Sequence, residues 1–389
     1  MNFETSKRFQ LIPPYLFARI DAMKQEAKEK GLDIINLGIG DPDLPTPKHI
    51  INALCKAAKN PVYHQYPPYE GFLTYRQAAA KWVENRFGVS FDPKNEVLAM
   101  IGSKEGIGHI PLAFINPGDY VLVPDPGYPV YHIGTTFAGG KTYRMPLLKE
   151  NNFLPDLKAI PEKVLAKAKM MWLNYPNNPT GAVASIKFFE EVVRFAKKHK
   201  IIVCHDMAYS EIYYNNEAPP SFFSAKGSKD VGIEFHSLSK TYNMTGWRLG
   251  FVVGNRQLVQ ALGNIKNNLD SGQFGAIQEA AITAMSSDQL CVQKLRDIYQ
   301  KRRDVLVNGL KSLGWDVCNP GGGFYVWIPV PKGFKSMDFT AKILSETGIV
   351  TTPGVGFGQY GEGYIRMTVT TDIARLKEAV KRLSKMSLK

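Results

Sequence analysis

The middle of the chain alternates short apolar runs with amphipathic segments, and this alternation limits the possible folds more than any other feature. Helix-like segments, of which Ile186–His199 is the clearest, separate a series of strand-like runs. These runs are Tyr120–Pro124, Met170–Asn174, Ile201–His205, Gly232–His236 and Leu249–Val253. Strands that alternate with helices indicate a mainly parallel sheet covered on both faces. We therefore expect an α/β fold.

Beyond about residue 285 the pattern changes. A long helical segment, Gln289–Leu313, leads to a hairpin-like stretch around Gly321–Ile328 and then to mixed structure, which indicates a smaller α+β unit. A chain of 389 residues is long enough for two domains. We expect a large domain at residues 41–284, and a small domain formed by residues 285–389 together with the N-terminal arm, residues 1–40.

The chain is basic, with 48 Lys and Arg against 35 Asp and Glu and a formal net charge of +13. Such an excess of positive charge can help to bind nucleic acid, a membrane surface or small anions. The densest basic stretches, Arg194–Lys200 and Lys301–Arg303, have helical spacing and are interpreted as solvated faces. We therefore expect an anionic cofactor and an acidic substrate as partners, and no nucleic acid.

Three further features of the sequence concern its compartment. No apolar run approaches the roughly 20 residues that a membrane-spanning helix needs. The start, Met1–Gln10, is polar and lacks the apolar core of a signal peptide. The four cysteines are scattered without metal-binding spacing, and Cys204 lies inside an apolar run, which suits reduced thiols. We expect a cytoplasmic protein with no membrane partner and no metal site.

The strongest candidate for chemistry is the segment from Ser237 to Gly250, which reads SLSKTYNMTGWRLG. An apolar strand enters a loop rich in Ser and Thr that contains Lys240 and ends at Arg248, and another apolar strand follows. Hydroxyl groups, a lysine and an arginine around one loop can cradle a phosphate. A lysine there can also form an imine with an aldehyde cofactor. The alternative is a solvated surface loop.

Two polar motifs follow other apolar strands. Asp206 ends the run that begins at Ile201, and Tyr209 comes three residues later. Open α/β sheets bind ligands at the carboxyl ends of their strands, where a carboxylate can keep a pyridinium nitrogen protonated. A lone aspartate at a strand end is otherwise a turn or cap residue. Asn178 lies in NYPNNPTG, residues 174–181, which by itself predicts a tight turn.

Three further motifs supply candidate ligand-binding residues. Ser103 and Lys104 open a predicted helix, where backbone N–H groups favour phosphate, although helix capping alone would explain them. Tyr128 follows the strand Tyr120–Pro124, and a core tyrosine is the alternative there. Arg366 is flanked by apolar residues in a strand-like run, so it needs a carboxylate partner, either a ligand or a structural ion pair.

In their order along the chain, over about residues 36–366, these motifs resemble those of the class I/II aminotransferases of fold type I. That family has S-x-S-K followed by G-x-R-x-G, together with D-x-A-Y and N-P-T-G patterns. The resemblance implies pyridoxal 5'-phosphate as the cofactor, bound as an imine by Lys240. It also implies a large domain with a mainly parallel sheet between helices, and a smaller α+β domain.

The resemblance assigns the remaining cofactor contacts. Asp206 pairs with the ring nitrogen, Ala208 packs on one ring face, and Tyr209 hydrogen-bonds the ring oxygen. Tyr128 stacks on the ring, and Asn178 reaches both the ring oxygen and the substrate carboxylate. The cofactor phosphate is held by Ser103, Lys104, Ser237, Ser239 and Arg248.

The resemblance also assigns substrate and subunit contacts. Arg366 forks the α-carboxylate of the substrate, which the backbone of Gly40 approaches. Tyr66, in HQYPPYEG at residues 64–71, reaches the phosphate of the neighbouring subunit. The resemblance therefore implies a homodimer with shared active sites.

Within the family, the chain resembles members that act on LL-2,6-diaminopimelate. The resemblance lies in PPYLFARI at residues 13–20, in LGIGD at residues 37–41, and in Lys104 after Ser103. In those members an N-terminal tyrosine helps to bind substrate, which is Tyr15 here, and Lys104 and Tyr128 are further candidates. YPPYEG and NLDSGQF, however, also resemble alanine-type transaminases.

The predicted reaction is therefore amino transfer from LL-2,6-diaminopimelate to 2-oxoglutarate, by a ping-pong mechanism, in lysine biosynthesis. The alternatives are an alanine- or aspartate-type aminotransferase, a pyridoxal-phosphate C–S lyase and, from another class, a non-catalytic regulator that binds the cofactor.

Overall fold

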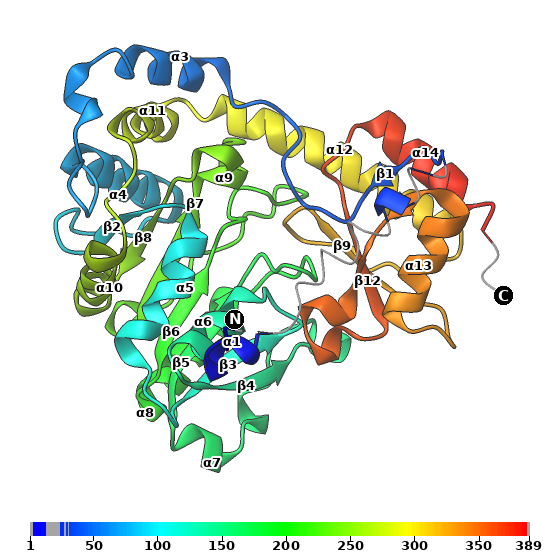
Figure 1. Ribbon diagram of the computed structural model, residues 1–389, viewed down its shortest axis with the longest axis horizontal. Helices are drawn as coiled ribbons and strands as arrows, with labels where there is room; N and C mark the ends of the chain where they lie inside the picture. The colour runs from blue at the N-terminus through cyan, green and yellow to red at the C-terminus, as the bar shows by residue number, and fades with distance from the viewer. Residues whose placement is uncertain (1–2, 13–23, 27–28, 30, 387–389) are drawn as a thin grey trace.

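The structure, a computed structural model, describes residues 3–12, 24–26, 29 and 31–386. The larger part of these residues is built around a seven-stranded sheet with the strand order β2-β8-β7-β6-β5-β3-β4 (Figure 1). The bounds in chain order are β2 Val97–Met100, β3 Tyr120–Asp125, β4 Lys141–Pro146, β5 Ala168–Asn174, β6 Ile202–Asp206, β7 Gly232–Ser237 and β8 Gly250–Gly254. Strands β7, β6, β5, β3 and β4 are parallel, so the predicted mainly parallel sheet is confirmed.

The five strand-like runs predicted in the middle of the chain belong to this sheet, with bounds that differ by at most two residues. Strand β8 runs antiparallel to both of its neighbours, β7 and β2. This reversal could not be predicted, because an apolar run carries no sign of the direction of its strand. The reversal brings the end of β7 and the start of β8 to the same edge of the sheet, where the segment from Ser237 to Gly250 joins them.

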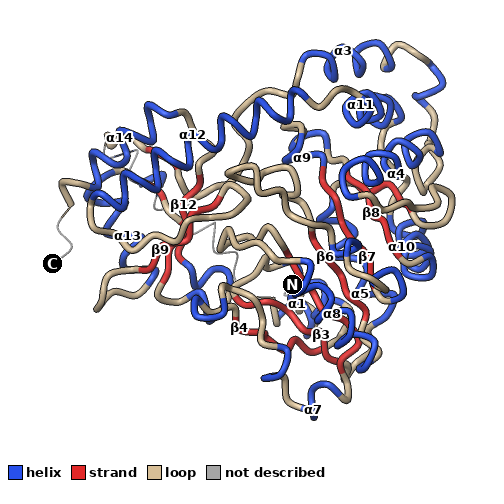
Figure 2. Tube along the Cα trace, turned by 180° about the vertical axis from the view of Figure 1, so that it is seen from behind, coloured by secondary structure: helices blue, strands red, loops and turns tan. Residues whose placement is uncertain are grey.

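Helices cover both faces of the sheet (Figures 1 and 2). Helices α5 (Ser103–Phe114), α6 (Val130–Phe137) and α10 (Arg256–Leu269) pack on one face, against side chains such as Val121 and Cys204. Helices α4 (Leu73–Phe87), α8 (Ile186–His199) and α11 (Gly275–Ser286) pack on the other, against side chains such as Leu122 and Val203. Because successive side chains of a strand point to opposite faces, each strand supplies both apolar cores.

Helix α8 shows how the sequence sets one of these elements. The Oγ of Ser185 accepts a hydrogen bond from the Phe188 backbone N–H and caps the first turn. The apolar side chains recur at helical spacing and are buried, and the helix ends at Lys200, which adopts a left-handed backbone with φ of 56°. The predicted helix Ile186–His199 is therefore confirmed at both ends.

Among the described residues, the second unit contains two small sheets and three α-helices. An antiparallel sheet has the order β11-β12-β9, and a parallel pair joins β1 to β10. An apolar core that includes Ile35, Phe324 and Leu376 lies between these strands and the helices. The bounds are β1 Ile35–Asn36, α12 Leu290–Ser312, β9 Tyr325–Pro329, α13 Ser336–Thr347, β10 Ile349–Val350, β11 Thr352–Pro353, β12 Tyr364–Thr368 and α14 Ile373–Leu383.

The hairpin expected around Gly321–Ile328 is wrong. Strand β9 pairs with β12, more than thirty residues later, and not with a neighbouring strand. Gly322 instead forms an isolated bridge with Tyr213. Tight turns signalled by glycine do not by themselves decide which strands pair.

Helix α12 runs between the two units (Figure 1), with Val292 in the core of the large sheet and Leu306 in the core of the small unit. The expectation that Lys301–Arg303 is a solvated face is wrong for two of its three residues. Arg302 is 4% exposed and Arg303 is 6% exposed. Both are buried because polar partners reach them from neighbouring segments, Asp43 for Arg302 and Asn215 for Arg303.

The remaining elements are short or lie at the periphery. Helix α3 packs on α11, and helix α1 contacts α6, where Arg8 donates a hydrogen bond to the Phe137 carbonyl. Their bounds, with those of two more helices, are α1 Lys7–Gln10, α3 Lys48–Ala57, α7 Glu162–Leu165 and α9 Leu238–Thr241. None of the helices in the described ranges combines the length and apolarity needed to cross a membrane.

Candidate active site

Lys240 lies in α9, the short helix that begins directly after β7. The Oγ of Ser237 accepts a hydrogen bond of 3.2 Å from the Ser239 backbone N–H and caps this helix. Burial lowers the pKa of the Lys240 amine to about 8. Because a lower pKa leaves more of the amine unprotonated near neutral pH, Lys240 can act as a nucleophile and as a base.

Four charged groups from distant parts of the chain act on the Lys240 amine. The carboxylates of Asp41 and Asp206 raise its pKa, while the guanidinium groups of Arg248 and Arg366 lower it. The fold therefore brings these predicted site residues, together with Asp41, to the carboxyl edge of the sheet. Asp41 was not among the predicted residues.

Asp206 ends β6 and is 5% exposed. Its carboxylate accepts a hydrogen bond of 2.8 Å from the Tyr131 hydroxyl and one of 3.2 Å from the Ala208 backbone N–H. Burial nevertheless raises the pKa of this carboxyl group. A carboxylate in this state is stabilised by a cationic partner, and a protonated ring nitrogen is such a partner.

Arg366 lies in β12 and is 4% exposed. It donates hydrogen bonds of 2.8 Å to Asn178 Oδ1 and 2.7 Å to the Gly38 carbonyl, while its Nε has no partner among the described residues. No acidic side chain in the described ranges forms an ion pair with it. The structure therefore does not support the alternative that Arg366 forms a structural ion pair. A buried guanidinium that contacts only neutral acceptors has capacity left for a carboxylate ligand.

Tyr325 closes one side of this site. Its ring lies 4.2 Å beneath the Arg366 guanidinium, and its hydroxyl is 2.9 Å from that of Tyr209. Gly40 packs against the same ring so closely that an added Cβ would lie 2.3 Å from it. Gly40 therefore contacts the Tyr325 ring, and Gly38 supplies the carbonyl that Arg366 contacts.

The start of α5 and Arg248 form a second polar region of the site. A Cβ added at Gly102, whose φ is +70°, would lie 2.4 Å from the Arg248 Nη2 atom. Ser103 is the first residue of α5, and a Cβ added at Gly250 would lie 3.1 Å from its backbone nitrogen. An exposed guanidinium at the amino end of a twelve-residue helix favours a phosphate.

These groups fit the expected cofactor. The Lys240 amine suits an aldehyde, the buried Asp206 carboxylate suits a basic ring nitrogen, and Arg248 with the start of α5 suits a phosphate. The aldehyde, the ring nitrogen and the phosphate of one molecule would thus each contact a complementary group at one edge of the sheet.

For the other predicted residues, the structure mainly gives the degree of exposure. Tyr128 is half-buried, with its ring edge-on to that of Tyr131 at 5.8 Å between centroids. Lys104 is exposed, and Tyr66 is 88% exposed. Tyr15 lies outside the described residues.

Sequence reasoning missed Tyr131, Tyr325 and Asp41. Tyr131 precedes Asp206 by 75 residues, and Tyr325 follows Tyr209 by 116. The only available signals were the proximity of Tyr131 to Tyr128 and of Asp41 to Gly40. No local pattern marked Tyr325, which lies in an ordinary apolar strand.

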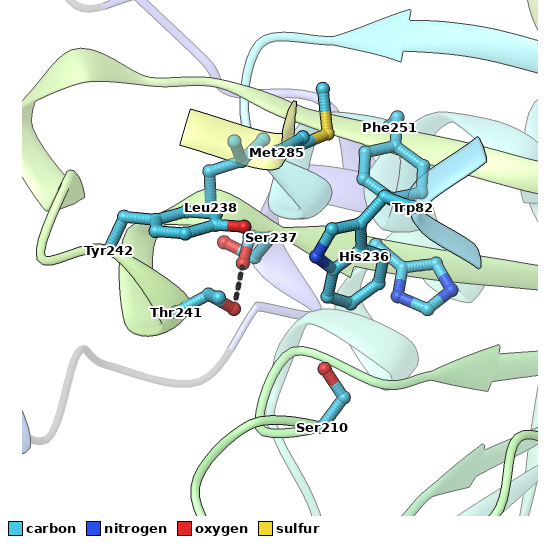
Figure 3. Close-up of a pocket in the computed structure, with 9 residues that line it drawn as sticks. All are labelled: Trp82, Ser210, His236, Ser237, Leu238, Thr241, Tyr242, Phe251 and Met285. Atoms are coloured by element: carbon cyan, nitrogen blue, oxygen red, sulfur yellow. Dashed lines mark hydrogen bonds between the residues drawn. The ribbon is translucent and has the colours of Figure 1, made fainter. Parts of the chain in front are cut away.

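A narrow cavity of about 10 Å³ lies behind α9, with room for about one water molecule (Figure 3). The rings of Trp82, His236 and Phe251 lie together on one side of it, and Tyr242 and Met285 complete the lining with smaller residues. Lys240 does not line this space. The cavity therefore belongs to the packing of α9 on the sheet and is too small for a substrate.

Comparison with known proteins places this site in a family. Residues 32–383 match the family of class I and II aminotransferases. The LL-diaminopimelate aminotransferase of Syntrophobacter fumaroxidans is 55% identical over the whole of both chains. That of Aquifex aeolicus is 53% identical over 99% of this chain and 100% of its own length.

Solved structures show the same fold. The substrate-bound structure of BacF from Bacillus subtilis has a TM-score of 0.94, with 40% identity over 99% of this chain and 98% of its own. A probable N-succinyldiaminopimelate aminotransferase from Thermus thermophilus has a TM-score of 0.91, with 35% identity over 96% of this chain and 100% of its own. The chain therefore belongs to the class I and II aminotransferases, which are pyridoxal-phosphate-dependent enzymes.

Proposed function

We propose that this enzyme transfers the amino group of LL-2,6-diaminopimelate to 2-oxoglutarate, in lysine biosynthesis. The observation that carries an amino-acid substrate is Arg366, a buried guanidinium without an acidic partner among the described residues. The names of the full-length relatives at 53–55% identity support this particular donor.

Arg366 and Asn178 orient the donor in this proposal. The guanidinium binds the α-carboxylate, and the Asn178 amide lies 2.8 Å from the same guanidinium. Anchoring the carboxylate there directs the Cα–H bond of the donor toward Lys240. Such orientation supplies much of the rate gain of an enzyme, because reacting groups no longer need to find each other.

Lys240 and Asp206 carry the proton chemistry. Bound pyridoxal phosphate supplies an electron sink for negative charge that develops at Cα. Asp206 keeps the ring nitrogen protonated, because its buried carboxylate forms no ion pair among the described residues and a protonated ring nitrogen would supply the cationic partner. The Lys240 amine, with a pKa of about 8, would take the proton from Cα and deliver it to the cofactor carbon, and in the second half-reaction it would move a proton in the opposite direction.

Recognition of the distal end requires polar groups, because diaminopimelate carries an ammonium and a carboxylate there. Lys104 and Tyr128 are the described candidates, with Tyr15 as a third. A site built to hydrogen-bond that end rejects donors that lack it much more strongly than an apolar pocket does. Alanine should therefore be a poor donor.

We also propose that the enzyme is a cytoplasmic homodimer with shared active sites. The exposure of Tyr66 supports the shared site, since an 88% exposed tyrosine is free to reach a second subunit. The four cysteines are all unpaired, as is usual in a reducing compartment.

The donor is tested with a panel of amino acids assayed at equal concentration with 2-oxoglutarate. LL-2,6-diaminopimelate should give the highest kcat/KM. If alanine or aspartate gives a higher value, the proposed donor is wrong, although the aminotransferase activity stands. Release of thiol or ammonia without glutamate formation would instead indicate a lyase.

The role of Lys240 is tested by cofactor attachment. Borohydride should fix the cofactor to the unsubstituted protein and to Lys104→Ala, which removes an exposed lysine at the site. Lys240→Ala should lose this attachment entirely. Reducible attachment that persists in Lys240→Ala, followed by mass spectrometry of the peptides, would assign the linkage to another lysine.

A further inference from the structure

The segment Gly38–Thr46, here called the strap, crosses from the small unit to the large sheet beside the active site. It has no helix or strand, and none of its backbone groups forms a backbone–backbone hydrogen bond within the described chain. Its conformation therefore depends on contacts with side chains. Several of these contacts involve the residues that form the site.

Both ends of the strap are anchored. At the start, the Gly38 carbonyl accepts hydrogen bonds of 2.7 Å from Arg366 and 2.7 Å from the Thr352 hydroxyl. At the end, the Thr46 hydroxyl donates a bond of 2.6 Å to the Asn243 carbonyl, three residues after Lys240. The strap thus links the substrate-carboxylate side of the site to the lysine loop.

The middle of the strap is held by one ion pair. Arg302 of α12 donates two parallel hydrogen bonds to Asp43, Nη1 to Oδ1 at 2.7 Å and Nη2 to Oδ2 at 2.8 Å. Arg302 is 4% exposed, while the Asp43 side chain is 30% exposed. A bidentate fork fixes orientation as well as distance, and lysine cannot reproduce it.

Asp41, two residues before Asp43, lies within electrostatic reach of Lys240. Gly40, between Gly38 and Asp41, is fitted against the Tyr325 ring. A shift in the middle of the strap would therefore change the groups around both the lysine and the substrate carboxylate.

We propose that Arg302 is a positioning residue for catalysis, which fixes the strap through Asp43 and so places the Gly38 carbonyl at Arg366 and the Asp41 carboxylate near Lys240. This inference rests on the proposed function, in which Lys240 and Arg366 form the active site. The hydrogen bonds of Arg302 in the described chain go to Asp43 and to the Val369 carbonyl, so its effect on the site runs through the strap.

The chain supplies a matched control. Asp33, ten residues before Asp43, accepts the same kind of fork from Arg375, with two bonds of 2.8 Å. Arg375 ties the segment around Asp33 to α14, where Arg382 also pairs with Asp33, and within the described residues the hydrogen bonds of Arg375 do not reach the strap or the site. Arg302→Lys and Arg375→Lys therefore remove the same interaction at two places, and both keep the charge.

The test compares these two variants as cofactor-loaded enzymes. Arg302→Lys should raise the KM for the donor roughly tenfold to a hundredfold, with a smaller change in kcat. It should also lower the pH midpoint of the absorbance of the lysine-bound cofactor by about half a unit, because the displaced Asp41 carboxylate no longer stabilises the protonated imine nitrogen. Arg375→Lys should leave both values unchanged.

A second pair of variants replaces the first if the first does not fold. If thermal unfolding shows that Arg302→Lys is not folded, Asp43→Asn and Asp33→Asn are compared in the same way, with the same outcome expected. Equal KM values and equal midpoints in the two members of a folded pair would overturn the inference alone. Absence of lysine-bound cofactor in the unsubstituted enzyme would overturn the proposed function as well.

Discussion

Two buried carboxylates on adjacent strands, Asp206 in β6 and Glu234 in β7, have opposite surroundings. Asp206 accepts hydrogen bonds from one hydroxyl and one backbone N–H, and burial raises its pKa. Burial also acts to raise the pKa of Glu234, but its hydrogen bonds with His205 and His236 outweigh this effect and lower the pKa. The Ser221 hydroxyl and the Phe222 backbone N–H complete the shell of Glu234.

The sheet explains how two such groups lie so close together. His205 and Glu234 are partners in the β6–β7 ladder, and Asp206 follows His205. Because successive side chains point to opposite faces, Asp206 faces the site while the His205–Glu234–His236 cluster faces the helices behind it. The fully satisfied carboxylate serves stability, and the partly satisfied one retains capacity for a ligand.

The largest effect should come from Asp206→Asn. We expect kcat/KM to fall at least roughly a thousandfold, about 4 kcal/mol of transition-state stabilisation, because a neutral amide does not hold a protonated ring nitrogen. The fold and its urea midpoint should change little, since the ionised carboxylate is itself unfavourable there. Near-normal turnover in a folded, cofactor-loaded variant would remove Asp206 from the mechanism.

Glu234→Gln should show the reverse pattern. Glutamine offers one acceptor oxygen where the carboxylate offers two, so buried donors around Glu234 lose their acceptor, and the free energy of unfolding should fall by about 3 kcal/mol. Turnover per folded molecule should change less than in Asp206→Asn. Urea unfolding at pH 7 measures the first quantity, and a loss of turnover without a loss of stability would erase the distinction between the two carboxylates.

Lowering the pH should test the lowered pKa of Glu234 through the stability of the protein. A depressed folded-state pKa contributes stability that is complete above the unfolded value, about 4.3 for Glu, and is lost as the pH falls below it. The unsubstituted enzyme should therefore lose about 2 kcal/mol more than Glu234→Gln between pH 5 and pH 3. Parallel stability curves for the two proteins over this range would contradict the lowered pKa.

The smallest effect should come from Tyr131→Phe, which removes the hydroxyl that donates to Asp206 and keeps the ring stacked on Trp172. Losing a donor to a charged acceptor should lower kcat/KM about tenfold. Stopped-flow measurement of each half-reaction would show whether both slow equally. An unchanged rate would mean that Asp206 needs no second donor to hold its orientation.

Much of the fold could be predicted from local pattern, because periodicity and capping are local. The helix Ile186–His199 and the strands at the centre of the sheet appeared where apolar spacing placed them. The direction of β8, the pairing of β9 with β12 and the burial of Arg302 could not be predicted. The pairing of β9 and the burial of Arg302 depend on partners that are distant in the sequence, and the direction of β8 could not be predicted because an apolar run carries no sign of its direction.

The residues of the site also fall into two groups, those that a local pattern could predict and those that it could not. Lys240, Asp206 and Arg366 stand in motifs whose spacing could be recognised, although their roles remain proposals. Tyr131 and Tyr325 do not, because a tyrosine in an apolar segment looks like any core residue until its hydroxyl has a partner. The surroundings that set the pKa of a carboxyl group are properties of the folded chain alone.

The pairing of β1 with β10 has a consequence for how the protein is made. Ile35 lies beside Ile349, so β1 lacks the strand with which it pairs in the described chain until about 310 further residues have been synthesised. The central sheet is complete by Gly254 and can form while translation continues. The strap that follows β1 cannot be anchored before β10 has been synthesised. A nascent chain that stalls before Ile349 therefore carries the Lys240 loop on a complete sheet, while its active site is still incomplete.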